Sequence, residues 1–198
     1  KAVELAMAAN FYTAGEVCSN ATRVFVHRSI AKELIARMVK KTAALKVGDP
    51  MADDVDIGAL ISEDHLGKVM GMIAKGLEEG AKCAVGGQRV RPQGFENGYF
   101  VEPTILTECQ DDMTVVRDEI FGPVMSVLVF DDEDEVISRA NATPYGLGAG
   151  LVTRDLARAH RMADRLDAGN VWVNTYNLIP PDLPFGGAKG TGFGRESS

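Results

Sequence analysis

The feature that most constrains the fold is a regular alternation of short β-branched or apolar runs with longer amphipathic segments. Strands are expected at residues 22–27, 82–85, 99–106, 125–130, 148–153 and 170–174, and helices at 1–13, 30–45, 63–79, 131–141 and 155–166. This alternation favours parallel strands joined by right-handed crossover helices. We therefore predict an α/β fold with a mostly parallel twisted sheet flanked by helices, in a chain of 198 residues that is long enough for one sizeable core or at most two small ones.

Turn-forming and capping residues separate the expected elements. Ser29, Ser62 and Asp155 each stand just before a helical segment, where their side chains can cap the first turn. Two glycine runs, Gly146–Gly150 and Gly190–Gly194, have the spacing G-x-G-x-G and do not join a strand to a helix. They lack the dinucleotide-binding pattern and are predicted to form tight turns.

Composition and charge exclude several classes of protein. The 198 residues include 21 Lys and Arg against 28 Asp and Glu, which gives a net charge of −7 and no basic stripe for nucleic acid. No run approaches the roughly 20 apolar residues of a membrane span. The three cysteines and three histidines have neither disulfide-framework nor zinc-site spacing. We expect no metal site and a reducing, cytoplasmic compartment.

One cysteine stands out by its position. Cys18 follows Gly15, where the first helix is expected to end, and precedes the first strand. In such a turn, nearby backbone N–H groups can stabilise a thiolate and later an oxyanion. Spacing alone leaves two interpretations, a nucleophile or a small buried apolar residue. Cys83 and Cys109 lie in or just after apolar strands and are predicted to be packing residues.

Three segments then carry a family resemblance. They are GEVCSNATR at 15–23, EIFGPV at 119–124 and PFGGAKGTGFGRE at 184–196. All three resemble motifs of the NAD(P)-dependent aldehyde dehydrogenases, in that family's order and over nearly the whole chain. Among the subfamilies, the chain looks most similar to the betaine aldehyde and 4-trimethylaminobutyraldehyde dehydrogenases.

The resemblance implies a mechanism and a set of site residues. Cys18 matches the nucleophile, whose thiohemiacetal passes a hydride to the nicotinamide and whose thioester water hydrolyses to the acid. The backbone N–H of Cys18 would form half of the oxyanion hole. Glu119 matches the carboxylate that holds the nicotinamide ribose, and Phe121 would pack against the nicotinamide. Lys68 and His65 fall where side chains often reach the ribose, although both also fit an exposed helix face. The implied cofactor is NAD, with NADP as the alternative.

Tyr12 and Phe185 fall where quaternary-ammonium aldehyde enzymes build an aromatic box. Aromatic faces attract such cations by about 0.5–2 kcal/mol each. The same pair also fits a tunnel for an uncharged aldehyde. Two departures from the family pattern are Glu16, where glutamine is commoner, and Lys189 after Ala188, where an aromatic residue is usual.

The resemblance also implies that residues 1–198 form a single catalytic domain and that important parts lie outside this chain. The dinucleotide-binding domain, the general-base glutamate and the oxyanion-hole asparagine are expected upstream of residue 1, and the oligomerisation strand beyond residue 198. We therefore expect no NAD-linked turnover from the chain alone, and a homodimer or homotetramer for the complete enzyme. Two alternatives stay open: a CoA-acylating semialdehyde dehydrogenase, and a non-catalytic structural or interaction domain. A cysteine hydrolase is a poor fit, because nothing places His27 at the thiol.

Overall fold

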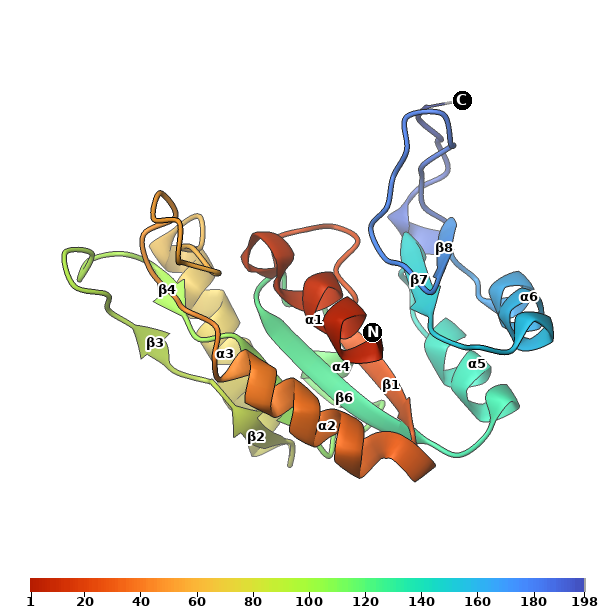
Figure 1. Ribbon diagram of the computed structural model, residues 1–198, viewed down its shortest axis with the longest axis horizontal. Coiled ribbons are helices and arrows are strands. Elements are labelled where there is room, and N and C mark those ends of the chain that lie inside the picture. The colour runs from red at the N-terminus through yellow and green to blue at the C-terminus, as the bar shows by residue number, and fades with distance from the viewer. Residues whose placement is uncertain (198) are drawn as a thin grey trace.

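A computed structural model describes residues 1–197 as an α/β fold (Figure 1). The strands are β1 (Arg23–His27), β2 (Lys82–Val85), β3 (Arg89–Val90), β4 (Phe100–Val101), β5 (Thr104–Thr107), β6 (Val124–Phe130), β7 (Gly148–Leu151) and β8 (Asn170–Val173). The helices are α1 (Ala2–Phe11), α2 (Arg28–Thr42), α3 (Glu63–Glu78), α4 (Thr114–Arg117), α5 (Glu133–Asn141) and α6 (Leu156–Arg165), with short 3-10 helices η1 (Tyr12–Gly15) and η2 (Lys189–Thr191).

The main sheet has the strand order β1-β6-β5-β2. The β1–β6 and β6–β5 pairs are parallel, whereas β2 joins the edge antiparallel to β5. Figure 1 shows α1 and α2 in front of this sheet and α3 and α4 behind it. The predicted mostly parallel sheet flanked by helices is confirmed.

Two smaller sheets complete the fold. β3 and β4 form a short antiparallel hairpin. β7 and β8 form a separate parallel pair joined through α6. β1 and β7 each end their sheet, and an apolar groove of about 730 Å³ lies between them, lined by residues that include Leu5, Val24 and Leu151.

The hydrophobic core lies around β5 and β6. The first five residues of β6 are buried, as its apolar sequence predicts, and fully burying each large aliphatic side chain contributes about 1.5–3 kcal/mol. The polar exception is Ser126, which is fully buried and donates a hydrogen bond from Oγ to the carbonyl of Val115 at 2.9 Å. That bond also ties β6 to the short helix α4.

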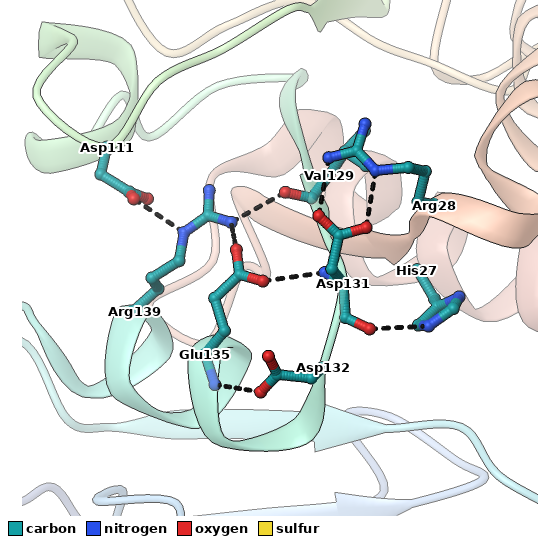
Figure 2. Close-up of polar contacts among 8 residues, drawn as sticks. All are labelled: His27, Arg28, Asp111, Val129, Asp131, Asp132, Glu135 and Arg139. Carbon is teal, nitrogen blue, oxygen red and sulfur yellow. Dashed lines mark hydrogen bonds and ion pairs between the residues drawn. The ribbon is translucent and has the colours of Figure 1, made fainter.

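A polar network anchors α5 against the main sheet (Figure 2). Arg139 of α5 donates to Asp111 at 2.7 Å, to the Val129 carbonyl at 2.8 Å and to Glu135 at 2.7 Å. Its guanidinium also lies 5.3 Å from the centre of the Phe25 ring. Because these contacts join α5, β1, β6 and the loop before α4, they fix the position from which the chain continues to β7.

Several predicted boundaries were wrong, each for a local reason. Pro103 cannot donate a ladder hydrogen bond, and the expected strand 99–106 is split around it into β4 and β5. α2 begins at Arg28, because the His27 side chain rather than Ser29 accepts from the first-turn N–H, and it ends at Thr42. The expected caps Ser62 and Asp155 are confirmed.

The first glycine run is not a tight turn. Gly148 and Gly150 lie inside β7, and a Cβ there would come within 2.8 Å of the Trp172 ring and 2.6 Å of the Tyr176 ring. The missing side chains therefore let two aromatic rings lie against the strand. The second run, 190–194, begins inside a turn, because Gly190 lies in the 3-10 helix η2.

Candidate active site

Cys18 lies in a tightly bent loop between α1 and β1. The chain leaves α1 through η1, where Thr13, Ala14 and Gly15 all have positive φ angles of 51°, 52° and 74°. Three consecutive left-handed residues reverse the chain direction within a few ångströms. The predicted helix over 1–13 therefore ends at Phe11, and the Cys18 side chain is exposed.

Asn20 supports this loop from inside the protein. Its Nδ2 donates to the carbonyl of Gly15 at 2.8 Å and to the carbonyl of Asn10 at 3.2 Å. The backbone N–H of Ala21 also donates to the carbonyl of Ala9 at 3.0 Å. These bonds attach both sides of the Cys18 loop to the end of α1.

A second pair of contacts comes from the segment after β8. The Tyr176 hydroxyl donates to the carbonyl of Ser19 at 2.9 Å, and Ser19 Oγ donates to Asn177 Oδ1 at 2.7 Å. Burial raises the pKa of Tyr176, so its phenol stays protonated and remains a donor. Sequence reasoning missed these residues, because no spacing signal reveals a bond between a tyrosine and a backbone carbonyl so distant in the chain.

Cys18 and Glu119 line one cavity of about 380 Å³. The cavity also has walls from residues 19–23, from residues 145–150, which lead into and begin β7, and from Tyr176. Glu119 stands in the segment between α4 and β6, and its side chain is exposed. The structure thus brings together the two residues for which the sequence predicted catalytic and cofactor-binding roles.

Phe121 and His65 contact each other, and neither is among the residues that line that cavity. Phe121 has a positive φ of 58°, and its carbonyl lies 2.6 Å from His65 Nε2. The two rings meet edge to face, with centroids 6.1 Å apart. Glu16 Oε1 lies 3.4 Å from the same His65 nitrogen.

Lys68, Tyr12 and Phe185 are not brought to the Cys18 cavity. Lys68 lies exposed on α3, one turn after His65. Tyr12 lies in η1 with 68% of its surface exposed, and Phe185 pairs with Glu196 in an isolated bridge near the C-terminus. Their predicted roles, cofactor binding for Lys68 and an aromatic box for the other two, stay predictions.

The other two cysteines differ from each other. Cys109 is buried among the core residues, as predicted, and burial raises its pKa to about 11. Cys83 is exposed, so its expected packing role was wrong. Cys83 lies in the short strand β2, at the edge of the main sheet. Its thiol contacts the carbonyl oxygens of Val85 and Gly86.

Among residues 1–197, no group of three or more His, Cys, Asp or Glu side chains is arranged to hold a metal ion. No helix within the same residues has both the length and the apolar character needed to cross a bilayer.

Comparison with known proteins adds independent information. The sequence profile of the Aldehyde dehydrogenase family matches residues 1–198. The chain is 52% identical to the betaine aldehyde dehydrogenase of Brucella anthropi over 192 residues. This aligned region covers 97% of this chain and 39% of that protein. The chain is also 52% identical over 198 residues to 4-trimethylaminobutyraldehyde dehydrogenase A of Danio rerio, covering 99% of this chain and 39% of that protein.

Solved structures agree with the sequence comparison. The NAD+ complex of an aldehyde dehydrogenase from Bacillus cereus matches with a TM-score of 0.94 at 44% identity, over 98% of this chain and 39% of that one. Betaine aldehyde dehydrogenase from Staphylococcus aureus, in complex with NAD+ and with a BME-modified cysteine, matches with a TM-score of 0.96 at 35% identity, over 98% and 40%. The chain spans about 39–40% of the length of the curated relatives it matches. By sequence and by fold, it belongs to the aldehyde dehydrogenase family.

Proposed function

We propose that this chain supplies the nucleophile of an enzyme that oxidises an aldehyde to the carboxylic acid with NAD. The observation that carries the proposal is the shared cavity, in which an exposed cysteine and an exposed glutamate from distant parts of the sequence face one space. Family membership supports the same reaction class. The described S. aureus relative carries a chemically modified cysteine, which supports thiol chemistry in this fold.

Cys18 performs the covalent chemistry in this proposal. Its thiolate adds to the aldehyde carbon and forms a thiohemiacetal, and the C–S bond keeps the substrate in place while the aldehyde carbon loses its hydride. The backbone N–H of Cys18 stabilises the negative oxygen formed in the addition. After oxidation, water attacks the resulting thioester, the C–S bond breaks, and the acid leaves with the thiol restored.

The residues of this cavity fit a nicotinamide cofactor. Glu119 presents two carboxylate oxygens to solvent at the cavity wall, and a ribose diol can donate to both of them. NAD, when bound, accepts the hydride released from the substrate carbon. Glu119 would hold the ribose, with Phe121 and Lys68 as the other predicted contacts. The solved NAD+ complexes of relatives support NAD, and NADP is the alternative cofactor.

Betaine aldehyde or a related aminoaldehyde is the proposed substrate. The support is the pair of relatives at 52% identity, which are a betaine aldehyde and a 4-trimethylaminobutyraldehyde dehydrogenase. Tyr12 and Phe185 are the proposed aromatic contacts for a trimethylammonium group. An uncharged aldehyde of similar size is the competing substrate.

We place this chain as the nucleophile-bearing domain of a longer polypeptide. The supporting observations are its 39–40% share of its relatives' length and the apolar groove between β1 and β7, each of which is the edge strand of its sheet. The complete enzyme is proposed to carry a dinucleotide-binding domain and to assemble as a cytoplasmic homodimer or homotetramer.

A substrate panel on the complete polypeptide tests this function. NADH formation is measured with betaine aldehyde, 4-aminobutyraldehyde and an uncharged aldehyde, for the unmodified protein and for Cys18→Ala. Cys83→Ala is the matched control, because Cys83 is also exposed but lies outside the cavity. We expect NADH with at least one aldehyde, its loss in Cys18→Ala and its retention in Cys83→Ala. NADH formation by Cys18→Ala at the normal rate would refute the proposal.

Two further measurements on the same polypeptide, acyl-CoA release when CoA is added and the rate of iodoacetamide labelling, separate the two rival functions. A CoA-acylating semialdehyde dehydrogenase would release an acyl-CoA, because a thiol rather than water resolves the thioester. A non-catalytic domain would form no NADH with any aldehyde, and its Cys18 would react with iodoacetamide no faster than Cys83.

A further inference from the structure

His65 contacts the protein itself, whereas its sequence position suggests a contact with the cofactor ribose. His65 lies in the first turn of α3, and its side chain is only 14% exposed. Its Nε2 lies 2.6 Å from the carbonyl oxygen of Phe121 and 3.4 Å from Glu16 Oε1. Glu16 is similarly covered, with 15% of its side chain exposed.

The chemistry of these partners fixes where the His65 proton lies. A carbonyl oxygen only accepts hydrogen bonds, so Nε2 must carry a hydrogen to make the 2.6 Å contact. The nearby Glu16 carboxylate favours a proton on the same nitrogen. His65 is therefore a donor to the protein backbone through Nε2.

Phe121 needs such a partner. A non-glycine residue at a φ of 58° is in a strained backbone conformation, which persists only where its surroundings hold it. His65 contacts Phe121 twice, through the carbonyl and through the edge-to-face ring contact. Since Glu119 stands two residues earlier, the direction of its carboxylate depends on how Phe121 is held.

Glu16 extends this contact to the nucleophile loop. Its Oε1 also accepts from the backbone N–H of Ile61 at 3.2 Å, just before the Ser62 cap of α3. Glu16 is two residues from Cys18. The pair Glu16–His65 thus joins the Cys18 loop, the start of α3 and the segment that carries Glu119.

We propose that His65, with Glu16 as its carboxylate partner, is a positioning residue that holds the Glu119–Phe121 segment in register with Cys18. The expected effect on the KM for NAD rests on the proposed function. The hydrogen bonds of His65 do not depend on that function. In this arrangement the effect of His65 on cofactor binding is transmitted through Phe121 and Glu119, without contact between its Nε2 and the cofactor.

The kinetic test uses four variants of the complete polypeptide. His65→Leu removes the donor, His65→Gln keeps an N–H donor, Glu16→Gln removes the charge, and Glu63→Gln is the control on an exposed residue of the same turn. We expect His65→Leu to raise the KM for NAD by about tenfold or more, with a smaller change in the KM for aldehyde. The KM for NAD of His65→Gln should be close to that of the unmodified protein, and that of Glu16→Gln should lie between the values for His65→Leu and the unmodified protein. Glu63→Gln should have the same KM for NAD as the unmodified protein.

Two kinetic results would overturn the proposal. One is an unchanged KM for NAD in His65→Leu or in Glu16→Gln. The other is a KM for NAD that is raised as much in a folded His65→Gln as in His65→Leu. The imidazole itself would then be required, rather than an N–H donor at this position.

A spectroscopic readout keeps this inference separate from the proposed function. Nitrogen NMR is recorded on the protein with 15N-labelled histidine, without cofactor, and the His65 signal is assigned as the one missing from His65→Gln. We expect this signal to show the tautomer whose hydrogen is on Nε2. A signal from the Nδ1–H tautomer would refute the arrangement. If no aldehyde yields NADH but the Nε2–H signal is present, the proposed function fails and the hydrogen-bond arrangement stands.

Discussion

Gly15 and Gly122 touch backbone to backbone, so the loop that carries Cys18 rests directly on the segment that carries Glu119. A Cβ added at Gly15 would overlap the carbonyl of Gly122 and lie 2.7 Å from the backbone nitrogen of Pro123. Gly15 also has a φ of 74°, which side chains disfavour. Two motifs that are far apart in the sequence are therefore held together by an approach that only glycine permits.

Gly15→Ala should destabilise the protein and abolish activity. Backbone strain alone costs about 1–3 kcal/mol, and the overlap with Gly122 adds to it, because a backbone carbonyl cannot move aside as a side chain can. Denaturant unfolding measures the loss of free energy of unfolding. The matched control is Gly67→Ala on the exposed face of α3, where a Cβ meets nothing within 4 Å.

The control is expected to change stability in the opposite direction. An alanine at an open helix position is more favourable than glycine by about 0.5–1 kcal/mol, so Gly67→Ala should unfold at slightly higher denaturant. Equal stability of Gly15→Ala and the unmodified protein would contradict the close backbone contact.

The three cysteines should react with iodoacetamide in the order Cys18, Cys83, Cys109. Cys18 and Cys83 are exposed, but partial burial raises the pKa of Cys83 and lowers its thiolate fraction. Cys109 is only 4% exposed and has its pKa raised to about 11, so its labelling should be slowest and should increase as the pH rises toward that value. Mass spectrometry of peptides from short reactions at neutral pH gives the three rates. Fast labelling of Cys109 in the native protein would show that the core around β6 opens.

The sequence was most informative where one local signal decides the structure. The largely apolar run at 125–130 predicted a strand, which is β6, and the Ser62 side chain caps α3 as expected. The cysteine motif and the E-I-F-G-P-V motif identified Cys18 and Glu119, which the fold brings to one cavity. In these cases periodicity, capping chemistry or a motif is contained in a few neighbouring residues.

The contacts that sequence reasoning missed depend on tertiary neighbours. The Tyr176 bond to Ser19 joins residues separated by 157 positions, and no pattern near either one signals it. The glycines of β7 were predicted to form a turn. The Trp172 and Tyr176 rings, which occupy the space beside these glycines, come from β8 and the loop after it, so the local sequence does not reveal them. Cys83 read as a packing residue, because an edge strand and a central strand of similar composition cannot be told apart without the sheet order.

Tyr176→Phe should weaken the attachment of the Cys18 loop without removing the aromatic ring. The lost hydrogen bond to the Ser19 carbonyl costs about 0.5–1.5 kcal/mol, since that bond is partly buried. Tyr145→Phe is the control: Tyr145 is 47% exposed, and the loss of its hydroxyl should change the free energy of unfolding by less than about 0.5 kcal/mol. Equal effects of the two substitutions would show that the Tyr176 hydroxyl does not hold the loop.

The contact between Glu79 and the start of α4 should make stability depend on acid pH. Glu79 accepts hydrogen bonds from the backbone N–H and from the hydroxyl of Thr114, both at 2.6 Å, and these bonds hold its pKa below the usual value. A lowered native pKa means that the unfolded chain binds a proton first as the pH falls. The contribution to stability is therefore fully present above the unfolded pKa of about 4.3 and is lost as the pH falls through the native pKa.

Glu79→Gln tests this by removing the ionisable group while keeping the side-chain shape. Its free energy of unfolding should lie below that of the unmodified protein at neutral pH, since charge-assisted hydrogen bonds are the stronger ones. The difference should shrink as the pH falls from about 4.3 through the lower native pKa of Glu79, because the carboxyl of the unmodified protein then becomes protonated and is neutral like the amide. Glu78→Gln is the control, because Glu78 is exposed and its side chain contacts Lys75 rather than α4. A Glu79→Gln difference that stays constant through the acid range would show that ionised Glu79 is not what holds Thr114.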